Sequence, residues 1–350
     1  MLLVAGRVMA QHPLMTLPIG DPAYEQLAAL DRQGCAAARI SPLRPFLVGD
    51  VQRAVVMTER YPECAGLIVD ELRVRFRPDT AAPLPRDVAP DLAAAAAAAA
   101  GEGDSEFSVG GMATVQVTSL EKGEFRPLWR GVRDTDEGTP PVVGTARVRA
   151  RWSGGPRIVA VTEAYAQTQR RNDPTVRSRA FRNTSGVLDF SEAYLAGRLG
   201  RLEINFGRSR EAWLGEGMES IALSANGPPL DRLTARLRWR SAEARALIAS
   251  VNGVTMQPAL DSLAAGTPAT RFHRVLIGHA LMVRPTSRLE LTLGETLVAS
   301  RTTRGFDLAY ANPLMPLIVT QNDTARLETD RRDNLVIFGG ARLDVGAGRI

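Results

Sequence analysis

From residue 112 to the end of the chain, apolar and polar positions alternate along short segments that end in turn residues. Residues 145–152 (TARVRARW) show the pattern clearly, with three arginines on one side and Ala, Val, Ala and Trp on the other. A period of two residues predicts β-strands with one apolar and one polar face. The expected strands cover residues 145–152, 157–166, 188–199, 201–208, 233–240, 246–256, 274–283, 289–300, 306–310 and 335–345. Their short connections favour antiparallel pairing, so residues 112–350 are expected to form a β domain of about ten to twelve strands.

The chain before residue 102 has a helical apolar period instead. An Asp-Pro pair at residue 21 and a glycine at residue 34 mark the ends of the first expected helix. Further helices are expected over residues 50–60, 64–76 and 87–101, the last of them a run of alanines closed by glycine. The segment 21–101 is therefore predicted to be a small helical bundle, which buries too little surface to be stable unless it packs on the rest of the chain. Residues 102–111 are expected to be the boundary between the two parts.

The first twenty residues have the features of an incomplete leader. The sequence MLLVAGRVMA carries a short apolar patch and ends in small residues. This resembles the tail of a signal peptide whose charged start is missing. We therefore expect residues 1–20 to be the remnant of a leader.

The sequence has no run of 18 apolar residues, which excludes a transmembrane helix but leaves a membrane β-barrel open. A soluble sandwich also has two-faced strands, but its polar face is expected to carry both signs of charge. Here two strands place three arginines each on the polar side, at residues 147, 149 and 151 and at residues 236, 238 and 240. In a barrel this side faces the lumen. Aromatic residues make up 5% of the chain, which is low for two aromatic girdles, although Trp152 lies at the end of an apolar face, where an interfacial aromatic is expected.

The formal charge of the chain is +5, its pI is about 9.7, and only Lys122 is a lysine. Arginine binds planar anions through paired hydrogen bonds, which favours a partner that bears carboxylates or phosphates. A GC-rich genome produces the same bias, and both explanations stay open. Nucleic acid is not an expected partner, because no basic helix and no basic–aromatic interleaving occurs.

Cysteines occur at two positions, Cys35 and Cys64, both in the helical part. In an exported protein they would form one disulfide, and in the cytosol they would be two small buried hydrophobes. Their spacing excludes a CxxC motif, and both alternatives remain open.

Five pieces of the chain stand out by their order and spacing: residues 21–27 (DPAYEQL) with 44–46 (RPF), 206–208 (FGR) with 213–217 (WLGEG), 223–231 (LSANGPPLD), 279–281 (HAL) with 291–296 (LTLGET), and 307–316 (DLAYANPLMP). Together they resemble the Wzi-like capsule assembly proteins, a family of outer-membrane β-barrels with an N-terminal helical region. Two departures from the family pattern are a Trp-Leu-Gly at residue 213 in place of Trp-Gly-Pro and a chain end without a terminal aromatic strand. The barrel is therefore expected to be incomplete in this chain, with C-terminal strands missing.

The resemblance implies a non-catalytic, lectin-like protein of the outer membrane of a Gram-negative-type bacterium. Its expected partners are an anionic capsular or exopolysaccharide and the lipid of the outer membrane, and it is expected to act as a monomer without cofactor or metal. A porin or channel with a basic lumen is the alternative. The two functions differ in whether the helical bundle occludes the bore.

The candidate polysaccharide-binding residues are the two arginine rows and four residues of the loop after residue 207. They are Arg147, Arg149, Arg151, Arg236, Arg238, Arg240, Arg208, Arg210, Trp213 and Glu216. Stacked like charges repel, so the rows need either an acidic ligand or facing carboxylates from the helical bundle or from neighbouring strands. The expected carboxylates are Glu163, Glu192, Glu203 and Glu290. Both explanations stay open.

Enzymatic alternatives have less support in the sequence. Glu211, Glu216 and Glu219 surround Trp213, as a glycoside hydrolase would require, but pairing with Arg208 and Arg210 explains the same charges. A hydrolase would use His279, Glu295 and a serine facing the lumen. The three histidines, His12, His273 and His279, form no metal-binding motif.

Overall fold

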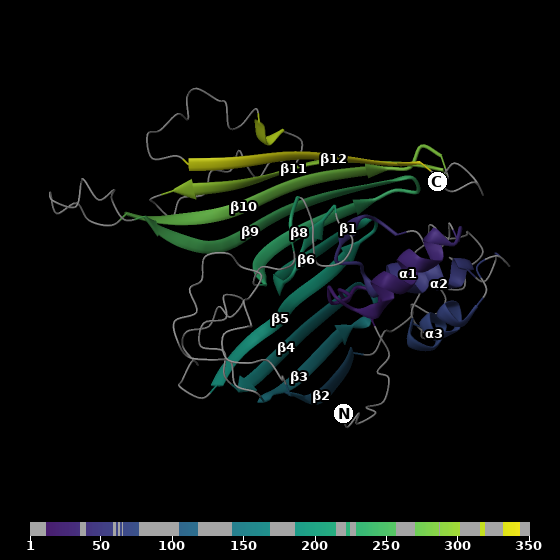
Figure 1. Cartoon of the computed structure of the whole chain (residues 1–350), viewed down its shortest axis with the longest axis horizontal. Coiled ribbons are helices and arrows are strands. Elements are labelled where there is room, and N and C mark those ends of the chain that lie inside the picture. The colour runs from purple at the N-terminus through teal and green to yellow at the C-terminus, as the bar shows by residue number, and fades with distance from the viewer. Residues whose placement is uncertain are drawn as a thin grey trace.

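The chain folds into a large antiparallel sheet with helices on one of its faces (Figure 1). The computed structural model describes residues 12–35, 40–58, 61, 64, 66–76, 105–117, 142–168, 186–214, 222–224, 229–256, 270–286, 288–301, 316–318 and 332–343. The sheet has ten strands in the order β12-β11-β10-β9-β8-β6-β5-β4-β3-β2, so each of its strands pairs with the next strand of the same sheet along the chain. The prediction of a mainly β, antiparallel architecture is confirmed. Over the described residues the sheet is not closed, and β2 and β12 form its two edges.

Most predicted strands are present within a few residues of their expected bounds. The strands of the sheet are β2 (Ser105–Val117), β3 (Val142–Gly154), β4 (Ile158–Thr168), β5 (Gly186–Leu199), β6 (Leu202–Ser209), β8 (Leu230–Arg238), β9 (Ala242–Met256), β10 (Thr270–Val283), β11 (Leu289–Arg301) and β12 (Arg332–Leu343). A separate two-stranded sheet pairs β1 (Leu43–Arg44) with β7 (Ala212–Trp213). The expected strand 306–310 lies outside the described residues.

The boundary predicted at residues 102–111 is wrong, because β2 begins at Ser105. The strand pairs with β3 over its whole length, from Ser105 opposite Gly154 to Val117 opposite Val142. Gly110 and Gly111 interrupt the apolar–polar alternation in this stretch, so its sequence has the character of a linker. Pairing with the neighbouring strand decides the structure here.

The connections between strands alternate strictly in length. Residues 155–157, 200–201, 239–241 and 284–288 join strands at one end of the sheet, here named the short-turn end. Residues 118–141, 169–185, 210–229, 257–269 and 302–331 join them at the other end, here named the long-connection end. Gly200 has a φ of +60°, which glycine adopts at no steric cost and which allows the tight turn between β5 and β6.

Helices α1 (Pro22–Arg32), α2 (Val48–Thr58) and α3 (Leu67–Phe76) match three of the expected helices. Asp21 caps α1, since its carboxylate accepts a hydrogen bond from the amide of Ala23 at 2.9 Å. The fourth expected helix, 87–101, lies outside the described residues. Among the described helices, none is long and apolar enough to cross a membrane.

Residues 12–20 belong to the folded helical region and not to a separate leader. Leu14 and Leu17 are buried, and Thr16 forms a β-bridge with Leu47. The boundary expected at residue 20 therefore lies too late in the chain. Residues 1–11 lie outside the described part.

The two faces of the sheet have different environments. The covered face carries the helices, and the apolar side chains of Val159, Val161, Tyr194 and Ala196 on it belong to the same core as α1, α2 and α3 (Figure 1). The opposite face is named the open face. A row of directly paired open-face residues crosses six strands: Phe107, Trp152, Ala160, Leu195, Phe206 and Leu233. All of them except Ala160 are large apolar side chains that remain exposed.

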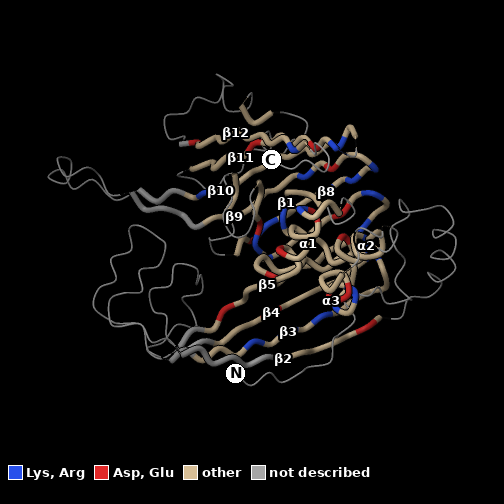
Figure 2. Tube along the Cα trace, turned by 45° about the vertical axis from the view of Figure 1, so that its right-hand side comes forward, with Lys and Arg blue, Asp and Glu red and all other residues tan. Residues whose placement is uncertain are grey.

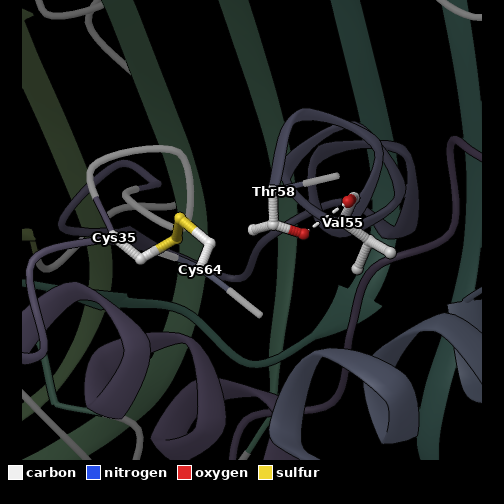
Figure 3. Close-up of a disulfide and its surroundings, with 4 residues drawn as sticks. All are labelled: Cys35, Val55, Thr58 and Cys64. Atoms are coloured by element: carbon white, nitrogen blue, oxygen red, sulfur yellow. Dashed lines mark hydrogen bonds between the residues drawn. A yellow bond between two sulfur atoms is a disulfide. The ribbon is translucent and has the colours of Figure 1, made fainter. Parts of the chain in front are cut away.

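The question left open for the two cysteines is settled by a disulfide between Cys35 and Cys64 (Figure 3). The bond joins the segment after α1 to the segment before α3, and the two α-carbons are 5.1 Å apart. Both residues are buried in the core that α1, α2 and α3 share.

We expect the double variant Cys35→Ser/Cys64→Ser to lose about 3 kcal/mol of unfolding free energy. The bond closes a loop with a sequence separation of 29, and opening that loop raises the entropy of the unfolded chain. Denaturant unfolding of the oxidised protein and of the variant measures the difference. An unchanged midpoint would show that helix packing alone holds this region.

Candidate functional site

The arginines of β3 lie on the covered face and become more exposed along the strand. The side chain of Arg151, near the short-turn end, is 6% exposed, that of Arg149 is 30% exposed, and that of Arg147 is 48% exposed. Each meets a carboxylate, as one of the two explanations predicted. Arg149 donates to Glu192 at 2.8 Å, and Arg147 lies 3.6 Å from Glu163. The helices therefore cover one end of the row and leave the other end accessible.

The β8 row is built differently, because its first two arginines are fixed to helix α2. Asp50 accepts a hydrogen bond from Arg236 at 2.7 Å and another from Arg238. Figure 2 marks the basic and acidic positions of the chain in blue and red, on the helices as well as on the strands. Glu243 bridges Arg236, at 2.6 Å, and Arg245, at 2.8 Å, which are directly opposite each other on β8 and β9. Arg236 and Arg238 thus attach the helical region to the sheet.

The third arginine of the predicted β8 row, Arg240, does not share the contacts of the other two. Arg240 lies beyond the end of β8, in the short turn before β9, and its side chain is exposed. The predicted alternation stops at Arg238, where the strand ends, so Arg240 does not share the buried network. Of the expected carboxylates, Glu203 lies 3.4 Å from Arg236, whereas Glu290 pairs with Arg284 at 2.7 Å.

Asp50 stays ionised in this setting. Burial opposes its charge, but Arg236 and Arg238, together with Arg53, hold the pKa of Asp50 well below its usual range. The carboxylate also accepts a hydrogen bond from the amide of Leu47 at 3.2 Å. A single acidic residue therefore links the start of α2 to two strand residues. The sequence offers only one signal for this role, an acidic residue beside the apolar positions of a helix.

Trp213 is fully buried, so its ring is not available to a sugar. It pairs with Leu43 through the small β1–β7 sheet, and its ring contacts Phe338 edge-on at a centroid distance of 6.3 Å. Its indole nitrogen donates to Glu211 at 3.3 Å. Gly278 on β10 leaves room for the ring, since a Cβ there would lie 2.7 Å from it. The predicted aromatic contact is thus a core residue, and the predicted neighbour Glu216 lies outside the described residues.

Among the described residues of its segment, no second carboxylate lies beside Glu211, which forms ion pairs with two arginines. It lies 3.2 Å from Arg232 and 3.6 Å from Arg245, and all three side chains are buried. The sequence left open whether Glu211 belongs to a pair of catalytic carboxylates or to a set of ion pairs, and the structure has ion pairs. The partners are Arg232 and Arg245, however, and not the expected Arg208 and Arg210.

Arg208 lies at the end of β6 that points towards the long-connection end. It donates to Asp231 at 2.8 Å and to Asp189 at 3.2 Å, and its side chain is 23% exposed. Arg210 is half-buried. Arg208 and Arg147 are thus predicted site residues that retain access to solvent.

The N-terminal segment is attached at the short-turn end by His12. Its Nε2 donates to the carbonyl of Gly155 at 3.0 Å, and its Nδ1 accepts from the amide of Leu14 at 3.2 Å. This arrangement requires the neutral ring. Burial lowers the pKa of His12, in agreement with the geometry.

His279 and Glu295 do not face the helices. They are directly opposite each other on β10 and β11, at 3.2 Å, and the alternation of each strand places them on the open face, because the neighbouring Gly278 meets Trp213 on the covered face. Glu295 also accepts from the amide of Leu317 at 2.8 Å. The pair of His279 and Glu295 therefore lies on the open face and not on the face that carries the helices. Among the described residues no cluster of His, Cys, Asp and Glu has the arrangement of a metal site.

Neither the protein-family models nor the curated proteins include a match to this chain. The resemblance to the Wzi-like family therefore stays a prediction.

Proposed function

We propose that this chain forms part of the wall of an outer-membrane β-barrel whose bore holds the helical region as a plug. We further propose that the protein binds capsular or exopolysaccharide without catalysis, for capsule assembly and surface attachment. The observation that carries the proposal is the contrast between the two faces of one sheet. The open face exposes large apolar side chains on several strands, while the covered face carries paired charges.

The open face suits contact with lipid. Monomeric soluble proteins rarely expose contiguous apolar patches larger than a few hundred Å². Here the exposed apolar row runs from Phe107 on β2 to Leu233 on β8. On β11 the same face continues with Leu291 and Leu293. A bilayer core is a solvent in which such a surface is stable.

The connections at the two ends of the sheet also fit an outer-membrane barrel. Outer-membrane barrels have short turns on the periplasmic side and longer loops outside, and the connections of this sheet alternate in that way. Trp152 and Trp239 are exposed near the short turns, and Trp152 lies directly opposite Phe107 on the open face. Aromatic residues of this kind concentrate at the membrane–water interface. The disulfide is also typical of an exported protein.

The packed helical region favours a plugged barrel over an open channel. Contacts with the sheet occur at several places near the short-turn end, including His12 with Gly155, Asp50 with Arg236, and Asp31 with Arg342. A channel would need this region to leave the covered face. The accessible part of the lumen then lies towards the long-connection end, where Arg147 retains access to solvent.

Polymer binding at that end requires only weak contacts at each residue. Arg147 is accessible, and its pair with Glu163 is long at 3.6 Å, so an acidic sugar can compete for it. A long polymer binds many protein copies at once, which raises its overall affinity without any strong single site.

The membrane part of the proposal is tested by the depth of the outer tryptophans. In liposomes that contain lipids brominated at different chain positions, the fluorescence of Trp152 and Trp239 is expected to be quenched most strongly by bromine near the headgroups. Variants in which Trp129 is changed to phenylalanine and only one of Trp152 and Trp239 is kept identify the source of the signal, and Trp213 supplies a buried reference. If bromine at none of these depths quenches the fluorescence, the tryptophans do not contact lipid and the proposed membrane location is wrong.

Arg147→Gln is expected to reduce retention of an acidic polysaccharide, such as polygalacturonate, by the detergent-purified protein. One partly exposed ion pair contributes about 0.5–1 kcal/mol, or roughly 2–5-fold per contact, and the loss should shrink as salt rises. Arg73→Gln is the matched control, because Arg73 is similarly exposed at 44% and pairs with Asp70 on α3. Equal retention by both variants would exclude Arg147 from the site. No retention by the wild type, together with ion conductance in bilayers, would favour the channel.

A further inference from the structure

A small cavity lies between the helical region and the sheet. Its volume is about 40 Å³. The N-terminal segment contributes Leu14 and Thr16, the chain beside β1 contributes Pro45 and Leu47, and the opposite wall comes from β5, β6, β8 and β9. The cavity is therefore part of the contact by which the helices are attached to the covered face.

The polar atoms that line this cavity are unusual because several have no hydrogen-bond partner. Asn205 on β6 is 9% exposed, and neither its amide nitrogen nor its amide oxygen is paired. The hydroxyl of Thr16 and the Oε2 atom of Glu211 are also buried without a hydrogen bond, although Arg232 lies 3.2 Å from that oxygen. Buried polar groups in proteins are almost always paired with protein or with ordered water.

The charges around the cavity decide what kind of molecule fits. Arg232, Arg236 and Arg245 would repel a cation, and Glu203 and Glu211 would repel an anion. The unpaired atoms include both donors and acceptors, so the occupant must offer both. A sugar ring is too large for this volume, whereas a buried water needs only roughly 10–15 Å³.

We propose that this cavity is a built hydration site, in which roughly two or three ordered waters bind to Asn205, Thr16 and Glu211. Asn205 contributes most to the site, since both its amide nitrogen and its amide oxygen are buried without a hydrogen-bond partner. The contact between helices and sheet then has two parts. Around Val161 of β4 and Tyr194 of β5 it is dry, and around the cavity, between β5 and β9, it is wet. This inference does not depend on the proposed function.

A crystal structure of the full chain at 1.8 Å or better tests the proposal directly. The expected result is ordered water within hydrogen-bond distance of both amide atoms of Asn205. Crystals pressurised with xenon should show no xenon at this position, because xenon enters dry apolar cavities. Xenon in the cavity, or an Asn205 amide paired directly with a neighbouring side chain, would overturn the proposal.

Thermal unfolding of Asn205→Leu provides a second readout. Leucine has a similar size, so the variant removes the polar atoms without a large change in volume. If waters occupy the site, the variant removes the hydrogen bonds that residue 205 makes to them. The water at Glu211 then lacks these partners, and the melting temperature should fall or stay level. A higher melting temperature would show that the amide is unpaired in the native protein and would contradict the proposal. Asn334→Leu on β12 is the matched control, because Asn334 is exposed and remote from the cavity.

Discussion

Asp50→Asn is expected to lower the free energy of unfolding by about 3–5 kcal/mol. The change removes the carboxylate that Arg236 and Arg238 share, and the side chains of these arginines are only 8% and 12% exposed. Without that carboxylate, part of their charge stays buried and uncompensated. Glu203 and Glu243 remain nearby and hold the loss below the full cost of an isolated buried charge. Denaturant unfolding measures the effect, and limited proteolysis shows whether the helical region is the part that opens.

Asp70→Asn is the matched control for this prediction. Asp70 also pairs with an arginine, Arg73 at 2.8 Å, but its side chain is 63% exposed. An exposed pair of this kind contributes about 0–1 kcal/mol. The double variant Asp50→Asn/Arg238→Gln should recover part of the stability, because it removes one of the stranded charges. Equal losses at residues 50 and 70 would show that the link between α2 and β8 is unimportant.

Low pH is expected to weaken the same contact between α2 and β8. The pKa of Asp50 in the folded chain is held well below the unfolded value of about 3.9 by Arg236 and Arg238. The stability from this carboxylate is therefore fully present above about pH 4 and is lost as pH falls through the lower folded value. Protease resistance of the helical region in the wild type should persist from neutral pH to about pH 4 and fail below it. In Asp50→Asn the resistance should already be low at neutral pH.

Trp213→Ala is expected to cost about 3–5 kcal/mol of stability, the range for a large aromatic side chain removed from a core. The ring is fully buried against Gly278 and Phe338, and it anchors β7 to β1. The variant also leaves Glu211 without its indole donor. Trp239→Ala, at a residue that is 40% exposed, should change stability far less in detergent. If Trp213→Ala left stability unchanged but abolished polymer retention, the original prediction of a sugar contact would be restored.

The strands were predictable because alternation is a local property. The segment 145–152 shows which side chains share a face, and in the structure the arginines indeed lie together on one face of β3. Nothing local shows which face the helices cover. Asp50 and Arg236 are separated by 186 positions, so their contact is a product of the tertiary fold.

The errors have equally specific causes. Trp213 is flanked by charges and glycines, which indicates a surface loop, yet pairing with Leu43 draws it into the core. The glycines of β2 interrupt the apolar–polar alternation, so the sequence did not predict this strand, which pairs with β3 over its whole length. The disulfide stayed open because the number of residues between two cysteines says nothing about the distance between their α-carbons.

The burial of the disulfide has a consequence for the order of events during biogenesis. Cys35 is 1% exposed and Cys64 is 2% exposed, so no oxidising enzyme can reach these sulfurs once the helices have packed. The thiols must therefore be joined while this part of the chain is still open. A helical region that packs on the covered face therefore already carries the disulfide.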